Sequence, residues 1–382
     1  MPLPRVVIDL EKLRHINCGL GRYSLHLGRE IRAAAAGRFL PVFLLPQGAD
    51  RYFPDGGFAS IAVSPWNKEA IRRLYRPLLA PLVSALMPSR RAALWHVTSQ
   101  MSKYLPLDDR VPVVLTIHDL NFLHESPVDA RSDEIARKLA DIQRKVNRAT
   151  AIVADSAYVA DDVARHVDLG GRPMHVVPLA VSAPPAAATR RPAFVPPGPF
   201  LFTVGNCLPH KNFHVLFGLL EHLPERRLVI AGKKTTPYGE HLEREVARLG
   251  LAGRVILPGE VTDGDRQWLY EHCEAFLFPS LTEGFGFPVL EAMQCGKPVF
   301  LSRRTSLPEI AGDLGFYMNG YDPGELAEVY RDGLARSGAD PAFPQRLRDH
   351  AARFSWAATA RGYAEVYAGI LAAGDAHRPP RG

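Results

Sequence analysis

Runs of apolar residues and segments of helical periodicity alternate along the first half of the chain. The runs PRVVIDL, FLPVFLL, ALWHVT, VPVVLTI, AIVAD and MHVVP are rich in branched side chains and predict buried strands. Residues 20–36, 133–147 and 157–166 have the composition and spacing of helices. Strands that alternate with helices in this way predict a parallel sheet covered on both faces.

The alternation stops at residues 182–199 and resumes after them. This stretch, SAPPAAATRRPAFVPPGP, is rich in proline and alanine and has no periodicity, as is typical of a linker. Beyond it FLFTV, RLVIAG, RVILPG, AFLFPS and PVFLS predict five more strands, with helices between them. We therefore predict the α/β fold class with two doubly wound domains, at residues 1–183 and 199–355, joined by a linker at residues 184–198.

One more helix is predicted at the end of the chain. In FSWAATARGYAEVYAGILAAG the apolar residues recur at helical spacing from Trp356 to Ile370. The pattern allows two packings for the segment 356–382: the helix caps the second domain, or it packs back on the first.

Composition is that of an ordinary globular protein. Of the 382 residues 47% are hydrophobic and 23% charged, which excludes a disordered chain, a collagen and a coiled coil. No apolar run approaches the roughly 18 residues of a membrane span, and the start MPLPRVVIDLEKLRH has no signal-peptide pattern. Four scattered cysteines without CxxC spacing favour a reducing compartment, so we expect a cytoplasmic protein.

The net charge of +6 is too small to indicate nucleic acid as a partner. It suits phosphate-bearing substrates or anionic lipid headgroups. Residues 69–91 mix arginines with leucines, so this segment allows peripheral contact with the inner membrane's cytoplasmic face. Because Pro77 and Pro81 interrupt it, we favour a broken helix that covers the first sheet.

The densest chemical signal is PSLTEGFGFPVLEAMQCGKPVF, residues 279–300. A predicted strand enters a glycine-containing loop, and a helix is expected to begin near Pro288 and to end at Gly296. Open α/β sheets bind ligands at the carboxyl ends of their strands, and a helix N-terminus there favours an anion such as a diphosphate. Glu283 and Glu291 could hold the hydroxyls of two sugars on either side of it. The alternative is a solvated Glu283 and a Glu291 that interacts with the helix dipole.

The run EGFGFPVLEAM resembles the E-x₇-E signature of the retaining family 4 glycosyltransferases. VGNCLPHKN, RLVIAGKK, RVILPGEVTDGDRQWLY, TIHDL, GLGRY and FSWAATARGY are similar to further segments of that family, over nearly the whole chain and in matching order. The resemblance implies the GT-B fold: two Rossmann-like domains that face a central cleft, with the last helix crossing back to the N-terminal domain. It also implies transfer of a hexose from a GDP- or UDP-linked donor, without a metal or other cofactor, to a glycan or lipid-linked acceptor in polysaccharide biosynthesis. Mannose is expected from its frequency in the family, not from a residue.

The resemblance also assigns roles to individual residues. Glu283 would bind hydroxyls of the transferred sugar, Lys211 would face the diphosphate, and His118 would lie near the sugar. The donor-binding positions would be Gly19, Gly21, Arg22, Gly205, His210, Lys233, Lys234, Val261, Phe285, Gly286, Phe287 and Glu291, of which Glu291 would bind the ribose. His210 stands where the family usually has arginine, so one permanent cation is missing; Lys234 or Arg22 could supply it.

Three alternatives stay open at this point. Asp263 and Asp265 spell the DxD metal motif of another glycosyltransferase fold, although their position before a helical run favours N-capping by one of them. The chain could be another GT-B enzyme of sugar nucleotides, such as an epimerase or a phosphorylase. It could also be a two-lobed sugar-binding protein without catalysis, a class against which the Glu283/Glu291 pair argues.

Overall fold

The computed structural model describes residues 2–16, 18–63, 92–106, 108–124, 132–182, 190–195 and 197–376. The predicted segment 69–91 and residues 184–189 and 196 of the predicted linker lie outside these ranges. The chain forms two compact units. Unit 1 contains Met1–Leu120, Pro127–Leu179 and Ser355–Gly382, and unit 2 contains Asn121–Ser126 and Ala180–Phe354.

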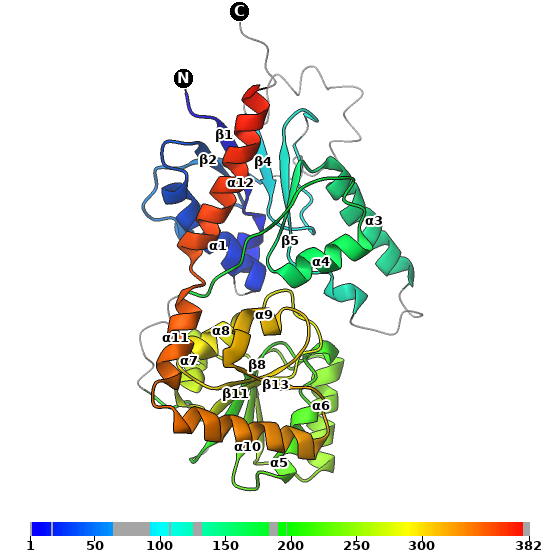
Figure 1. The fold of residues 1–382 in the computed structure, drawn as a ribbon, viewed down its shortest axis with the longest axis vertical. Coiled ribbons are helices and arrows are strands. Elements are labelled where there is room, and N and C mark those ends of the chain that lie inside the picture. Colours follow the sequence, from blue (N-terminus) through cyan, green and yellow to red (C-terminus); the bar gives the residue numbers. More distant parts are fainter. Residues whose placement is uncertain are drawn as a thin grey trace, which may run out of the picture. The chain divides into compact units, whose positions relative to one another are not determined.

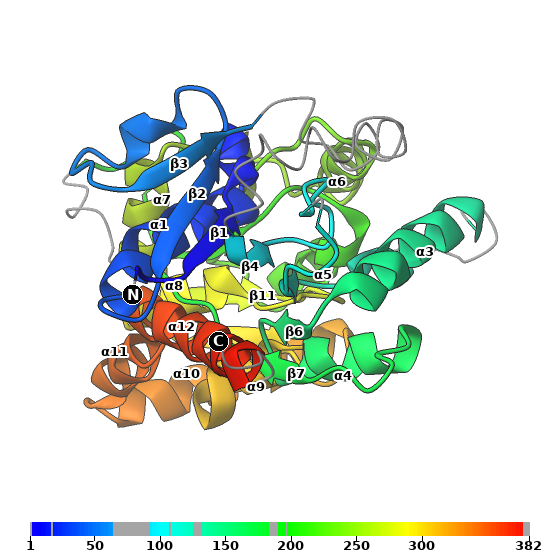
Figure 2. The same ribbon diagram turned by 90° about the horizontal axis from the view of Figure 1, so that it is seen from above.

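Unit 1 is built on a parallel sheet with the strand order β3-β2-β1-β4-β5-β6-β7. Its strands are β1 (Arg5–Asp9), β2 (Leu40–Leu45), β3 (Ala59–Ala62), β4 (Ala92–Val97), β5 (Val113–Ile117), β6 (Ala151–Ala154) and β7 (Met174–Val176). Every residue of β5 and β6 is buried, as expected of strands with both faces covered. Figure 2 shows β1, β2 and β3 side by side at one edge of this sheet.

The helices of unit 1 are α1 (Gly19–Ala34), α3 (Ser132–Arg148), α4 (Ala157–His166) and α12 (Trp356–Ala376). The predicted bounds of α4 are confirmed, because Ser156 caps it: the Ser156 hydroxyl accepts a hydrogen bond of 3.1 Å from the amide of Val159. Helix α12 packs along α1 and also contacts β4 (Figure 1). The last helix therefore belongs to the N-terminal sheet, as the resemblance implied.

Unit 2 has a second parallel sheet, with the order β10-β9-β8-β11-β12-β13. Its strands are β8 (Phe200–Val204), β9 (Arg227–Ala231), β10 (Val255–Gly259), β11 (Ala275–Phe278), β12 (Val299–Ser302) and β13 (Gly315–Met318). The five strands predicted here are confirmed. The edge strand β13 escaped prediction because only alternate residues of this four-residue strand are fully buried.

The helices of unit 2 cover its sheet. They are α5 (Val215–Glu221), α6 (Pro237–Arg248), α7 (Asp263–His272), α8 (Phe287–Gln294), α9 (Leu307–Ala311), α10 (Pro323–Ala339) and α11 (Phe343–Ala352). The core of the unit is aromatic: Phe202 and Phe276 pack edge to face on neighbouring strands, and Phe300 stacks on Phe316. Among the described helices of both units, none is long and apolar enough to span a membrane.

Candidate active site

The predicted strand, loop and helix around EGFGF are present in unit 2. Strand β11 ends at Phe278, and α8 begins at Phe287 with Pro288 in its first turn. Gly286 caps the helix with a φ of +108°, and a Cβ added there would lie 2.9 Å from Leu307 Cδ2. The backbone conformation at this position therefore favours glycine. Gly296, at a φ of +69°, follows the end of the helix as predicted.

Glu283 and Lys211 form the charged centre of this site. Lys211 Nζ lies 2.5 Å from Glu283 Oε1, and the two side chains are only 14% and 12% exposed. Lys211 Nζ is also 5.1 Å from the centroid of the Phe278 ring. The two residues lie 72 positions apart in sequence, yet the fold brings together the two groups that the resemblance links to the sugar and the diphosphate.

The main chain around Glu283 is held by the loop between β12 and α9. The Glu283 amide donates to Thr305 Oγ1 at 3.1 Å, and Ser306 Oγ donates to the carbonyls of Glu283 and Phe285 at 3.0 and 2.8 Å. Thr305 has a φ of +55°, a strained conformation for a β-branched residue. No sequence motif marks Thr305 and Ser306, so these two residues were not predicted.

Thr282 also fixes the loop that contains Glu283, between β11 and α8. Its hydroxyl donates to Asn121 Oδ1 at 2.6 Å, and Asn121 belongs to the short segment Asn121–Ser126 of unit 2. Phe285 anchors the loop from within the unit: it is buried and lies edge-on to the rings of Phe287 and Phe354. The position of Glu283 is therefore determined by several segments.

Glu291 is oriented by a tyrosine of α7. The Tyr270 hydroxyl donates to Glu291 Oε2 at 2.7 Å. Burial of the ring, followed by the charge of Glu291 and its hydrogen bond, raises the pKa of Tyr270 well above its ordinary value. Tyr270 therefore stays a hydrogen-bond donor and fixes one carboxylate oxygen of Glu291.

The ends of β8 and β9 approach each other closely. Gly205 and Gly232 have φ values of +153° and +135°, and a Cβ at Gly232 would lie 2.1 Å from the carbonyl oxygen of Gly205. Lys211 lies against Gly205, with its Cε 3.3 Å from where a Cβ would stand. The next residue, Asn212, has a φ of +57°. This strained turn fixes the point from which Lys211 extends.

The other residues of unit 2 that were predicted to bind the donor lie in the loops that follow β8, β9 and β10. The carbonyl of His210 accepts from the Leu281 amide at 2.7 Å, so this residue ties its loop to the end of β11. Lys234 Nζ pairs with Glu243 Oε1 of α6 at 2.8 Å, and the Lys233 carbonyl accepts from the Cys207 amide. Val261 lies between β10 and α7.

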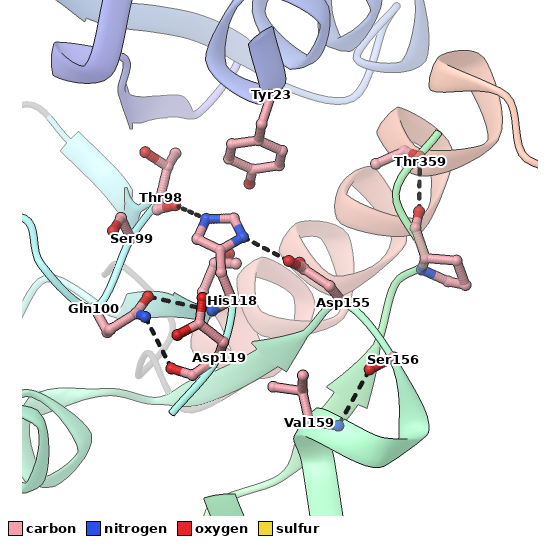
Figure 3. A network of polar contacts seen from close by, with 12 residues as sticks. Tyr23, Thr98, Ser99, Gln100, His118, Asp119, Asp155, Ser156, Val159 and Thr359 are labelled. Atoms are coloured by element: carbon pink, nitrogen blue, oxygen red, sulfur yellow. Dashed lines mark hydrogen bonds and ion pairs between the residues drawn. The ribbon is translucent and has the colours of Figure 1, made fainter. Parts of the chain in front are cut away.

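Four neighbouring strands of unit 1 place polar residues at their carboxyl ends. Asp9 ends β1, while Thr98, His118 and Asp155 follow directly after β4, β5 and β6. The Thr98 hydroxyl donates to the Asp9 carbonyl, and His118 lies between Thr98 and Asp155 (Figure 3). This is the edge at which parallel sheets bind ligands.

The GLGRY segment forms the start of α1. Gly19 and Gly21 lie in its first turn and Arg22 follows them, where the pattern predicted a helix from residue 20. A Cβ at Gly21 would lie 2.1 Å from the His15 carbonyl oxygen. Glycine is therefore needed at position 21 because α1 begins against the short 3₁₀ helix Glu11–His15.

The predicted N-cap of α7 is wrong by one to three residues. Thr262 is the cap: its hydroxyl accepts from the Asp265 amide at 3.0 Å, while Asp263 and Asp265 lie in the first turn. There their charges favour the helix dipole. Within the described residues, no three side chains of His, Cys, Asp or Glu are grouped as metal ligands would be.

Two family models match the chain, one on each half. The model described as Glycosyltransferase Family 4 matches residues 18–183, and the model described as Glycosyl transferases group 1 matches residues 188–351. Together they extend over most of the sequence and include every predicted site residue.

Among curated relatives, the serotype-specific mannosyltransferase WbdA of Escherichia coli is 33% identical over 58% of this chain, which spans only 29% of the relative. The O-antigen chain mannosyltransferase B of Escherichia coli is 26% identical over 92% of this chain and 96% of its own length. The chain thus spans less than a third of one relative and nearly all of the other.

Solved structures share the fold. The glycosyltransferase from Rickettsia africae ESF-5 has a TM-score of 0.69 and 16% identity, over 97% of this chain and 99% of its own. Anabaena Alr3699/HepE in complex with UDP and glucose has a TM-score of 0.69 and 18% identity, over 96% and 100%. These neighbours have the GT-B fold, so the predicted fold class is confirmed.

Proposed function

Because the chain belongs to the GT-B glycosyltransferases that these two family models describe, we propose that it transfers a hexose with retention of configuration. The donor would be a nucleoside diphosphate sugar, and the acceptor a hydroxyl of a glycan or a lipid-linked glycan. The observation that carries this proposal is the part-buried Lys211–Glu283 pair at the carboxyl edge of the second sheet. It joins a cation suited to a diphosphate with a carboxylate suited to sugar hydroxyls.

The positions of the side chains support a division of labour. The diphosphate would bind Lys211 and lie at the N-terminal end of α8, where the helix dipole favours an anion. Glu283 would bind hydroxyls of the hexose, and Glu291, held by Tyr270, would bind those of the ribose. The donor would have to replace or share the ion pair of Lys211 with Glu283. The roles of His118, Gly19, Gly21 and Arg22 in unit 1 are proposed from the family resemblance alone.

In the proposed reaction the bond between the sugar's anomeric carbon and the diphosphate oxygen breaks. The acceptor oxygen forms the new bond on the same face of the sugar, and its proton passes to the departing diphosphate oxygen. No enzyme nucleophile is needed. The protein would contribute position and a fixed positive charge from Lys211. That charge and the dipole of α8 would take the place of a metal ion, so we propose that the reaction needs none.

Mannose is the hexose that we propose first. Two relatives are named mannosyltransferases, and one of these names refers to an O-antigen chain. GDP and UDP are the nucleotides proposed for the donor. The structural neighbour HepE was solved with UDP-glucose, which fits a nucleoside diphosphate sugar in this fold. A lipid-linked acceptor would bring the reaction to the cytoplasmic face of a membrane.

The test is a thermal-shift screen of the full chain with GDP-, UDP-, ADP- and dTDP-sugars in EDTA, followed by NMR of the product. We expect one donor to raise the melting temperature, and the new glycosidic bond to keep the donor's anomeric configuration. An inverted product would contradict the retaining mechanism. Loss of transfer in EDTA that manganese restores would contradict metal independence. Donor binding without transfer or hydrolysis would favour a sugar-binding protein.

A further inference from the structure

Both ring nitrogens of His118 face oxygen atoms that accept hydrogen bonds. Nδ1 lies 2.6 Å from Asp155 Oδ2, and Nε2 lies 2.8 Å from the carbonyl oxygen of Thr98. A carbonyl oxygen can only accept, so Nε2 carries a hydrogen, and Nδ1 needs a second one to bond an ionised carboxylate. The arrangement in Figure 3 is therefore that of an imidazolium between two acceptors.

The negative charge of Asp155 is compensated by His118. The carboxylate is only 2% exposed, and its other oxygen, Oδ1, has no hydrogen-bond partner among the described residues. A buried carboxylate without a counter-charge is costly. Among the described residues, His118, itself 6% exposed, forms the ion pair with Asp155, so each charge of the pair stabilises the other.

Four other titratable groups of unit 1 lie near this pair. Tyr23 on α1 meets the His118 ring edge-on, with ring centroids 4.8 Å apart, and burial raises its pKa well above the ordinary value. His96 on β4 is neutral because burial, and then the charge of His118, lower its pKa to about 3. Asp119, next in the chain, adds a second negative charge near His118. On α12, Tyr363 faces Asp155, and burial raises its pKa too.

The electrostatic balance agrees with this geometry. Burial by itself would lower the pKa of His118. The charge and hydrogen bond of Asp155, together with the Thr98 carbonyl, outweigh burial and raise that pKa above its ordinary value.

The main chain at His118 is fixed as well. Its amide donates to Gln100 Oε1 at 3.2 Å, and Gln100 Nε2 donates to the Asp119 carbonyl at 2.9 Å. One side-chain amide thus joins both ends of the His118–Asp119 segment. The imidazolium has little freedom to turn toward another partner.

We propose that Asp155 is a positioning residue that holds His118 as an imidazolium. His118 then supplies a fixed positive charge at the edge of the sheet, and it has no lone pair with which to act as a base. The meaning of this charge for catalysis rests on the proposed function, because a cation there would stabilise the anionic donor. The protonation of His118 itself does not rest on it.

The protonation can be measured without substrate, by ¹⁵N NMR of the full chain with labelled histidine. A His118→Gln variant assigns the signal. We expect both nitrogens of His118 to carry hydrogens at pH 7.5, and Asp155→Asn to leave one unprotonated at that pH. Asp162→Asn is the matched control, because Asp162 is also a buried aspartate next to a histidine, His166, but lies on α4. It should leave the His118 signal unchanged.

Kinetics give a second readout. A histidine of ordinary pKa, about 6.5, is only about 1% cationic at pH 8.5. Between pH 6 and 8.5 the kcat of Asp155→Asn should therefore fall on the order of 10- to 100-fold further than that of the wild type. Asp155→Glu, which restores the charge, should return the profile toward the wild type.

The outcomes separate the two proposals. An unprotonated nitrogen on His118 of the active wild type at pH 7.5 would overturn the inference and leave the glycosyltransferase intact. A doubly protonated His118 in a chain that transfers no sugar would overturn the proposed function alone. If Asp155→Asn does not fold, the ¹⁵N NMR spectrum of the wild type at pH 7.5 still decides whether His118 is doubly protonated.

Discussion

Asp9 is a carboxyl group that the fold removes from water. It is fully buried at the end of β1, where Ser102 Oγ donates to Oδ2 and the Glu11 amide donates to Oδ1 at 3.0 Å. Burial raises the pKa of Asp9 to about 7, although both hydrogen bonds act in the opposite direction. The folded chain therefore binds a proton at this site at pH values where the unfolded chain has lost it.

This difference predicts how stability depends on pH. Between the ordinary pKa of 3.8 and about 7, the folded state holds more protons at Asp9, so its contribution to the unfolding free energy falls as pH rises. Asp9→Asn removes this dependence. Urea titrations measure the unfolding free energy of both proteins at each pH. The value for the variant minus that for the wild type should increase from pH 5 to pH 8. The exposed Asp55→Asn should change in parallel with the wild type, and a parallel change in Asp9→Asn would contradict the prediction.

At the scale of residues, the sequence could predict the motif-bearing side chains but not their supports. Glu283 and Lys211 stand in recognisable segments, and the structure brings them together. Asp155, Thr305 and Ser306 belong to no such segment. Asp155 and Thr305 each make one hydrogen bond to a residue at least 21 positions away, and Ser306 makes two such bonds. Pairings of this kind appear only once the chain is folded.

Helix α12 shows what helical periodicity can and cannot predict. The spacing indicated an apolar helix but allowed it to pack on either domain. Hydroxyl groups make the packing on unit 1 specific: Tyr23 donates to Tyr363 at 2.9 Å, and Tyr367 lies 2.6 Å from His96 Nδ1. Thr116 joins the two ends, with Oγ1 3.0 Å from the Tyr363 hydroxyl and 2.8 Å from His96 Nε2. Buried polar groups need such partners, and unit 1 provides them.

Two glycines of this helix give a matched test of its packing. A Cβ at Gly369 would have no neighbour within 4 Å, so Gly369→Ala should stabilise the protein by roughly 0.5–1 kcal/mol through helix propensity. A Cβ at Gly362 would lie 2.9 Å from Val177 Cγ1. Gly362→Ala should therefore lose that gain and destabilise by about 1–3 kcal/mol through overpacking.

Urea unfolding of the two variants beside the wild type measures the difference. Both replacements make the same chemical change on one helix, so a contrast between them reports on the contact with Val177. Equal stabilisation by both would mean that α12 does not pack against this residue.

At the scale of the whole molecule, the alternation of strands and helices was enough to predict two parallel sheets. The central strands read clearly because both of their faces are buried. The edge strands β3 and β13 were not predicted, since no residue of β3 and only alternate residues of β13 are buried, and their patterns are short. Sheet order was not predicted from the pattern either, because hydrogen bonding between distant strands decides it.

The central claim is that Glu283 binds the transferred sugar while Glu291 binds the ribose. A hydrogen bond from a carboxylate to a buried hydroxyl contributes roughly 1.5–3 kcal/mol. Because about 1.4 kcal/mol corresponds to a tenfold change, loss of either hydrogen bond should lower the affected affinity or rate on the order of 10- to 100-fold. The loss should appear in different measurements, because the bare nucleotide carries the ribose but not the hexose.

Calorimetry with the bare nucleoside diphosphate, beside transfer kinetics, tests this claim most directly. Glu283→Gln should leave nucleotide affinity nearly intact while transfer collapses, and Glu291→Gln should weaken nucleotide and full donor alike. Glu221→Gln, an exposed change at the end of α5, should alter neither. Equal weakening of nucleotide binding by Glu283→Gln and Glu291→Gln would contradict the assigned roles.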